Sequence, residues 1–154
     1  MERFKPNVTV AAVVKSGDRY LLVEEEKGGR RVFNQPAGHL EANESLLDAM
    51  RRELLEETGL TIEPQGLIAI YQYQGADALH FLRFTFWAEL DGAQPQPTPQ
   101  DSDIIAGHWL TLAELKERRS HWRSPMVGRS IADYLAGTRL PLDAIVQVAR
   151  QPHP

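Results

Sequence analysis

Short apolar runs divide most of the chain into expected β-strands. They are rich in Val, Leu, Ile and aromatic residues and are bounded by Gly, Pro, Asp or Ser, a pattern typical of strands joined by turns. The runs cover residues 8–14, 20–25, 66–74, 79–90 and 104–110. Between the first two, Ser16, Gly17 and Asp18 suit a tight turn, which predicts a β-hairpin. Residues 27–31 (KGGRR) then predict a flexible basic loop, followed by the short extended piece RVFNQPAG.

A helical period replaces this pattern in the segment GHLEANESLLDAMRRELLEETGL. Here Leu47, Met50 and Leu54 recur at the spacing of residues on the buried face of a helix. Asn43 can cap the start of this helix, and Gly59 supplies its end.

Two shorter helices are expected after the last strand. Thr111 and Glu114 form a capping box that begins the first of them. Ser124 with Pro125 begins the second, which we expect to end near Gly137.

This order of elements predicts an α/β fold in which a mixed sheet forms a sandwich with helices. The length of 154 residues and the hydrophobic content of 42% fit one globular domain. We expect that domain to span residues 1–147, and residues 148–154 to form a frayed tail.

Charge and cysteine content limit the possible partners, substrates and metal ligands. The formal net charge of −4 argues against nucleic-acid polymers and anionic membranes as partners, and an anionic substrate would need local positive charge. Because the chain has no cysteine, any metal must be held by oxygen or imidazole ligands. No signal segment or membrane-length apolar run is present, so we expect a cytoplasmic protein.

Three glutamates, Glu53, Glu56 and Glu57, crowd the last turns of the long helix. At about 100° per residue they fit one arc of about 100°, where like charges repel and the helix dipole disfavours anions. A divalent cation would remove both penalties, and carboxylate oxygens suit magnesium or manganese. Since Arg51 and Arg52 lie nearby, the glutamates alone are also compatible with an ordinary solvated surface.

The residues around these glutamates favour the metal site. The segment resembles the Nudix box, whose pattern is filled here by Gly38, Glu44, Arg52, Glu53, Leu54, Glu56, Glu57, Gly59 and Leu60. The resemblance to Nudix hydrolases implies an α/β/α sandwich with a mixed β-sheet and a loop–helix–loop catalytic motif. It also implies that a water attacks a phosphate within a diphosphate linkage.

The same resemblance assigns the metal ligands. In this family the positions of Glu53, Glu56 and Glu57 and the backbone carbonyl of Gly38 bind a divalent ion, usually Mg²⁺, with Mn²⁺ as a substitute. Glu53 and Glu57 are therefore expected to be catalytic, and Glu57 and Glu56 compete as activators of the water.

Further catalytic roles follow from the resemblance. The position of Glu44 supports the loop and the helix start, and Arg52 orients a catalytic glutamate. Family members often add a carboxylate from a loop opposite the box, for which Asp101 and Asp103 are candidates, Asp103 being slightly favoured. Both aspartates are also ordinary turn residues before a strand.

Six residues are candidates for substrate binding, on different grounds. Arg30 and Arg31 could close on a terminal phosphate from their glycine-containing loop, although mobile surface charge is the simpler interpretation. Arg83 can reach a pocket from its strand face, whereas His80 points to the other face and is expected to be structural.

The other three candidates flank predicted elements. Asn34 and Gln35 lead into the box, near aromatic residues on which a base or pyrimidine could stack. Arg123 precedes Ser124, at a helix start whose amides attract phosphate, although capping alone explains Ser124.

Likeness extends beyond the box to a narrower bacterial group of Nudix phosphatases, through FKPNVTVAAVV, NQPAGHLEANESL, FLRF, DSDI and RSP in the same order. It implies metal-dependent release of orthophosphate from thiamine pyrophosphate, hydroxymethylpyrimidine pyrophosphate and nucleoside di- and triphosphates. One alternative is a housecleaning nucleoside-triphosphate pyrophosphohydrolase; another is an inert nucleotide-sensing scaffold, which typically lacks the carboxylates. The expected partner is a small molecule, and the protein is expected to be a monomer or homodimer.

Overall fold

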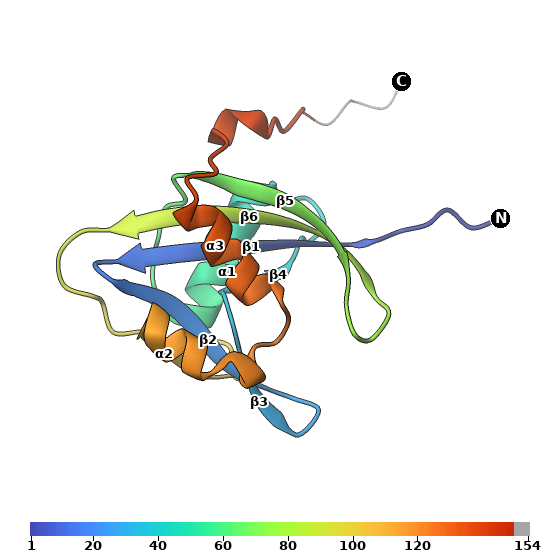
Figure 1. Ribbon diagram of the computed structural model, residues 1–154. Helices are drawn as coiled ribbons and strands as arrows, with labels where there is room; N and C mark the ends of the chain where they lie inside the picture. The colour runs from blue at the N-terminus through green and yellow to red at the C-terminus, as the bar shows by residue number, and fades with distance from the viewer. Residues whose placement is uncertain (150–154) are drawn as a thin grey trace.

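The computed structural model describes residues 1–149, which fold into a β-sheet with helices on both faces (Figure 1). The strands are β1 (Asn7–Ser16), β2 (Arg19–Lys27), β3 (Arg30–Asn34), β4 (Ala37–His39), β5 (Gly66–Gln74), β6 (His80–Leu90) and β7 (Ile104–Thr111). The helices are α1 (Leu46–Thr58), α2 (Leu112–Glu117) and α3 (Met126–Leu135), with 3₁₀ turns η1 (Arg119–His121) and η2 (Leu142–Ala144). Within this part of the chain no helix has the length and apolarity needed to cross a membrane.

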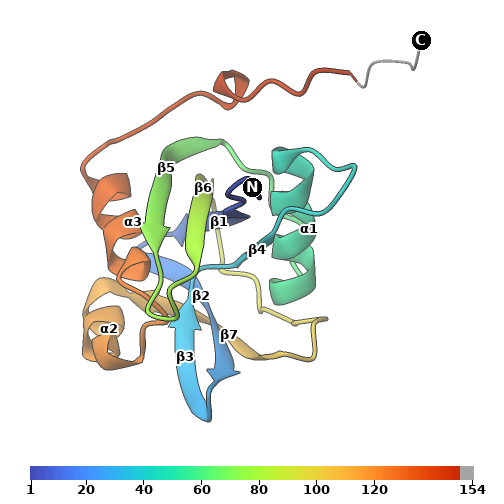
Figure 2. The ribbon, with the colours of Figure 1, turned by 90° about the vertical axis from the view of Figure 1, so that its right-hand side faces the viewer.

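The sheet has the strand order β3-β2-β1-β6-β5, with β4 paired to β1 and β7 paired to β2. Strands β1 and β6 are parallel and all other pairs are antiparallel, so the predicted mixed sheet is confirmed. Helix α1 covers one face, and α2 and α3 cover the other (Figure 2). The predicted α/β/α sandwich is therefore confirmed.

The alternation of side chains along β1 divides the core into two layers. One layer lies under α1 and includes Val10, Ala12, Val14, Leu21, Met50, Leu54 and Phe86. The other lies under α2 and α3 and includes Val13, Tyr20, Leu22, Ile68, Val127, Ile131 and Tyr134. Both faces of the sheet are thus fixed against helices, and this positions the ends of the strands near α1.

The catalytic-motif helix begins two residues later than Asn43 implied. Ser45 is the N-cap of α1, and its hydroxyl accepts a hydrogen bond from the Asp48 N–H at 3.0 Å. Asn43 instead adopts a left-handed conformation, with φ of 67°, in the turn before the helix. The predicted stop is confirmed, because Gly59 ends α1 with φ of 70° and its N–H donates to the Leu55 carbonyl.

Two further local predictions have different outcomes. The capping box of Thr111 and Glu114 is present at the start of α2. The prediction of a flexible basic loop is wrong for Arg30 and Arg31, because both lie in strand β3 and pair with β2. Only Gly28 and Gly29, before them, form the turn. Of the expected tail, residues 148 and 149 carry no regular structure, and residues 150–154 lie outside the described part.

Candidate active site

Two glutamates of α1 lie buried against β4. Glu53 is 9% exposed and Glu57 is 7% exposed. The Ala37 N–H donates to Glu57 Oε1 at 2.7 Å. A Cβ atom added to Gly38 would lie 2.0 Å from the Cδ of Glu53, so only glycine permits this approach. The helix and the short strand therefore hold both carboxylates at one place.

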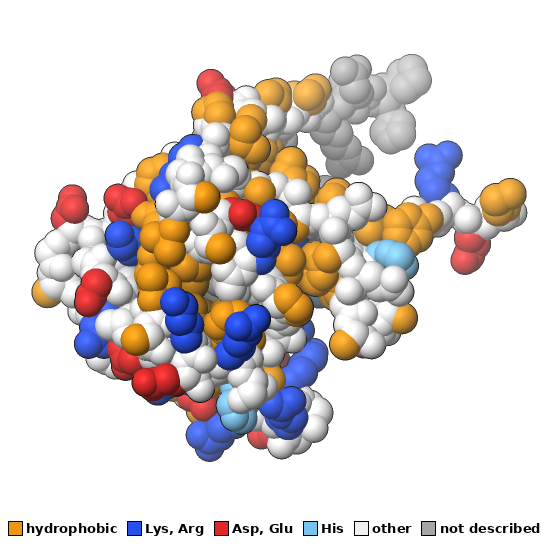
Figure 3. All heavy atoms as spheres, in the orientation of Figure 1, with side chains coloured by type: hydrophobic (Ala, Val, Ile, Leu, Met, Phe, Trp, Pro, Cys, Tyr) orange, Lys and Arg blue, Asp and Glu red, His pale blue; other side chains and the backbone are white. Residues whose placement is uncertain are grey.

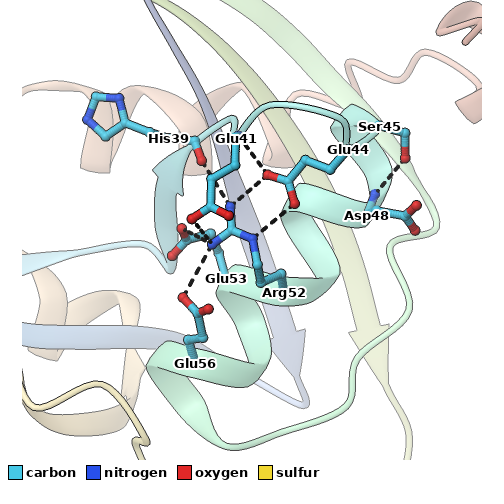
Figure 4. A network of polar contacts seen from close by, with 8 residues as sticks. All are labelled: His39, Glu41, Glu44, Ser45, Asp48, Arg52, Glu53 and Glu56. Carbon is cyan, nitrogen blue, oxygen red and sulfur yellow. Dashed lines mark hydrogen bonds and ion pairs between the residues drawn. The ribbon is translucent and has the colours of Figure 1, made fainter. Parts of the chain in front are cut away.

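Arg52 ties the preceding loop to these glutamates (Figure 4). Its Nη1 contacts Glu53 Oε1 at 2.7 Å and Glu56 Oε2 at 3.3 Å. Its Nη2 and Nε donate to the two carboxylate oxygens of Glu44 at 2.8 and 3.0 Å, and Nη2 also donates to the His39 carbonyl. The arrangement is compatible with the expected roles, in which Glu44 supports the loop and Arg52 orients Glu53.

The environment of the buried carboxylates disfavours their charged forms. Burial and, to a smaller extent, the nearby carboxylates of Glu53, Glu25 and Asp101 raise the pKa of Glu57 to about 8, although the hydrogen bond from Ala37 opposes this effect. Burial also raises the pKa of Glu53, although the ion pair with Arg52 opposes this effect. A cation placed among these groups would favour their charged forms.

These residues fit a hard divalent cation, because the donor set consists of oxygen atoms and holds excess negative charge. Glu53 and Glu57 are the buried candidates, the partly exposed Gly38 offers its carbonyl, and Glu56 lies on the same helix as the other glutamates. In the part of the chain that is described, no three His, Asp or Glu side chains converge closely enough to hold an ion. Glu56 is paired with Arg52 instead, and its side chain is 44% exposed, so metal binding requires these side chains to rearrange.

The proline-rich loop brings an additional carboxylate to α1. The backbone N–H groups of Gln100 and Asp101 both donate to the Glu56 carbonyl, at 2.9 and 2.8 Å. Asp101 also acts electrostatically on Glu53 and Glu57. Asp103 lies exposed on the surface, and its N–H donates to the Asp101 carboxylate. The structure thus favours Asp101 over the predicted Asp103 as the carboxylate from this loop.

Glu25 was missed by the sequence reasoning. It lies on β2, and its carboxylate is close enough to raise the pKa of Glu57. The period of two residues along the strand offered a signal, because Leu21 faces α1 and Glu25 lies four residues farther along. Because Glu24, Glu25 and Glu26 follow one another, the sequence alone did not indicate which of them faces α1.

A cavity of about 270 Å³ opens beside β4. Its lining includes Thr9, Asn34, Gly38, Tyr73, Phe81, Arg83 and Arg123. Gly38 belongs to both features, since it lines the cavity and contacts Glu53. The rings of Tyr73 and Phe81 stack with centroids 5.1 Å apart and form an aromatic wall.

The structure separates the six predicted substrate-binding residues. Asn34, Arg83 and Arg123 line the cavity. Gln35 is buried beside it, where it accepts a hydrogen bond from Arg83 at 3.1 Å and donates to the Val127 carbonyl at 2.8 Å.

The two arginines of the β2–β3 hairpin contact other partners. Arg30 donates to the Ser120 carbonyl at 2.7 Å, and Arg31 pairs with Glu24 at 3.5 Å. Neither arginine lines the cavity. Their assignment to substrate binding therefore has no support from their positions in β3.

Positive side chains gather on the face formed by α2 and α3 (Figure 3). A shallow hollow on this face is bordered by Lys116, Arg119, Arg123 and Arg129. Arg123 also lines the cavity beside β4. This positive charge lies on the opposite face of the sheet from α1, and two of its members are paired, Arg123 with Glu25 and Arg129 with Asp133.

Comparison with known proteins agrees with this geometry. The family model described as "NUDIX domain" matches residues 4–129. The chain belongs to the Nudix family. It is 46% identical over 142 residues to Phosphatase NudJ of Escherichia coli strain K12, and the match covers 92% of each chain. The resemblance stated from the sequence is therefore confirmed, as is a hydrolase acting on phosphorus-containing anhydrides.

Solved structures support the same assignment. A NUDIX hydrolase from Nitrosomonas europaea superposes with a TM-score of 0.86 at 42% identity, covering 94% of this chain and 98% of that chain. The NUDIX domain of Shewanella oneidensis NrtR, solved with ADP ribose, superposes with a TM-score of 0.75 at 17% identity. That match covers 88% of this chain and 90% of the other and supports the fold alone.

Proposed function

We propose that the protein is a divalent-metal-dependent phosphatase that releases orthophosphate from small pyrophosphorylated metabolites. The expected substrates are thiamine pyrophosphate, hydroxymethylpyrimidine pyrophosphate and nucleoside di- and triphosphates. The observation that carries the proposal is a complete Nudix box whose buried Glu53 lies against Gly38, a residue that lines a cavity shared with Arg83 and Arg123. The similarity to Phosphatase NudJ over nearly the whole chain supports phosphatase activity.

Glu53, Glu56, Glu57 and the Gly38 carbonyl would hold the ion, Mg²⁺ or in its place Mn²⁺. When bound, such an ion neutralises phosphate charge and lowers the pKa of the attacking water. Arg52 keeps the Glu53 carboxylate in position through its 2.7 Å contact. The Cβ-free backbone of Gly38 lets that carboxylate lie directly against β4.

Glu57 is the better placed base of the two glutamates considered. It is buried, and the Ala37 N–H holds one of its oxygens, which leaves the other free to accept the proton of the water. The water oxygen forms a bond to one phosphorus of the diphosphate and gives its proton to the base. The anhydride P–O bond breaks with its electron pair passing to the departing phosphate oxygen, and the products are orthophosphate and the organic phosphate.

The test is phosphate release from thiamine pyrophosphate, a nucleoside diphosphate and a nucleoside triphosphate with Mg²⁺, with and without added inorganic pyrophosphatase. The proposal expects phosphate in the absence of the helper enzyme. Phosphate that appears from the triphosphate only with the helper would instead identify a pyrophosphohydrolase. No phosphate from any substrate under either condition would contradict both assignments.

A further inference from the structure

Arg83 is a buried cation without a carboxylate partner. The residue is 3% exposed, and its Nη2 donates to the neutral Gln35 side chain. Its Nε has no hydrogen-bond partner, and none of the ion pairs found in residues 1–149 involves this guanidinium. Burying an unpaired charge costs free energy, so an anion that binds beside Arg83 would stabilise the protein.

The surroundings of Arg83 add positive charge. Lys27 and Arg123 line the same cavity, Arg123 being paired with Glu25, and Asp77 is the acidic residue of the lining. Burial lowers the pKa of Arg83, Tyr73 opposes this effect, and the nearby charge of Arg123 adds to it. Ser124 also lines the cavity, next to the start of the ten-residue helix α3, whose N-terminal dipole favours anions.

The register of the sheet places Arg83 on the face covered by α3, two strands away from β4. Thr9 of β1 is paired with Arg83 on one side and with His39 of β4 on the other. Gly38, the residue before His39, lines the cavity and touches Glu53. The cavity that holds the guanidinium therefore reaches β4, and Glu53 lies on the other side of Gly38.

We propose that this part of the cavity is a phosphate subsite, in which Arg83, assisted by Lys27 and Arg123, holds a substrate phosphate that the glutamates do not. The inference rests on the proposed function and adds the position of the second phosphate. Charge-assisted hydrogen bonds from a buried guanidinium suit phosphate oxygens. Binding through phosphate depends little on the structure of the organic group, which is consistent with several pyrophosphorylated metabolites as substrates.

The experiment measures binding of inorganic phosphate to the full-length protein in excess EDTA, by isothermal titration calorimetry. Without metal the glutamates repel phosphate, so binding reports the cationic subsite alone. We expect the wild-type protein to bind phosphate and Arg83→Gln to bind it about 10- to 100-fold more weakly. Arg19→Gln is the matched control, because this strand arginine is 41% exposed, lies outside the cavity and loses the same charge.

Lys27→Gln provides a second variant at an exposed position, where a failure to fold is not expected. It should weaken phosphate binding several-fold, and circular dichroism should show a native fold for every variant. Absence of phosphate binding by the wild-type protein would overturn the subsite. So would unchanged affinity in folded Arg83→Gln or, if that variant does not fold, unchanged affinity in Lys27→Gln.

The outcome separates the subsite from the proposed function. If the enzyme releases pyrophosphate but phosphate binding depends on Arg83, the subsite stands and the phosphatase assignment fails. If orthophosphate is released but phosphate affinity does not depend on these cations, the phosphatase assignment stands and the subsite fails.

Discussion

The raised pKa of Glu57 predicts how the metal-free protein loses stability with pH. The pKa of this carboxyl is about 8 in the folded protein, compared with 4.5 as the ordinary value. The folded state therefore keeps a proton that the unfolded state releases, and the free energy of unfolding falls as pH rises from about 4.5 to about 8. At about 1.4 kcal/mol for each pKa unit, the full loss is about 5 kcal/mol. This is a large share of the stability of about 5–15 kcal/mol that is typical of a domain.

Urea unfolding in excess EDTA at several pH values between 4.5 and 9 measures this loss. Glu57→Gln is the control, because the amide oxygen can still accept the Ala37 N–H while the titrating group is removed. The free energy of unfolding of the wild type, relative to this variant, should decrease through the window and level off above it. Mg²⁺ added at the upper end should restore stability to the wild type. A wild-type curve parallel to that of the variant would refute the reasoning.

Four substitutions test the site directly. Glu53→Gln should lower kcat by about 100-fold or more while the circular dichroism spectrum stays native, since it removes a metal charge at nearly constant volume; wild-type turnover would contradict the ligand assignment. Gly38→Ala should destabilise the protein by about 1–3 kcal/mol in urea unfolding and reduce turnover, because its Cβ would overlap the Glu53 carboxylate; an unchanged midpoint would show that the carboxylate moves freely. Asp101→Asn should reduce kcat more than Asp103→Asn in the phosphate-release assay, and the opposite order would restore Asp103 as the candidate.

Local sequence chemistry predicted much of the fold. The strand expected at residues 66–74 has those bounds in β5, and Gly59 and the Thr111 capping box act as expected. These features depend on residues close together in the chain. Asn43 and Ser45 show the limit of local chemistry, because both are good N-cap types and only the path of the preceding loop selects Ser45.

The candidate site also combines features that local sequence predicts with features that depend on distant contacts. Helix geometry alone placed Glu53 and Glu57 on one arc, and both lie buried on α1. The preference for Asp101, the proximity of Glu25 and the burial of Arg83 depend on contacts between distant segments. No spacing in the sequence specifies how the proline-rich loop meets the end of α1, so these relations required the three-dimensional structure.

The hydrogen bonds from that loop to α1 have a consequence for how the chain can be altered. Thr98 donates its N–H to the Thr58 carbonyl, and Gln100 and Asp101 donate to that of Glu56, so the loop closes the open end of the helix as another helical turn would. Lengthening the chain at residues 98–101 would expose these carbonyls and loosen the turn that carries the glutamates. Residues 91–93 lie before this attachment, and an added Cβ at Gly92 would meet nothing within 4 Å. A tag or reporter inserted there would leave the end of the catalytic helix closed.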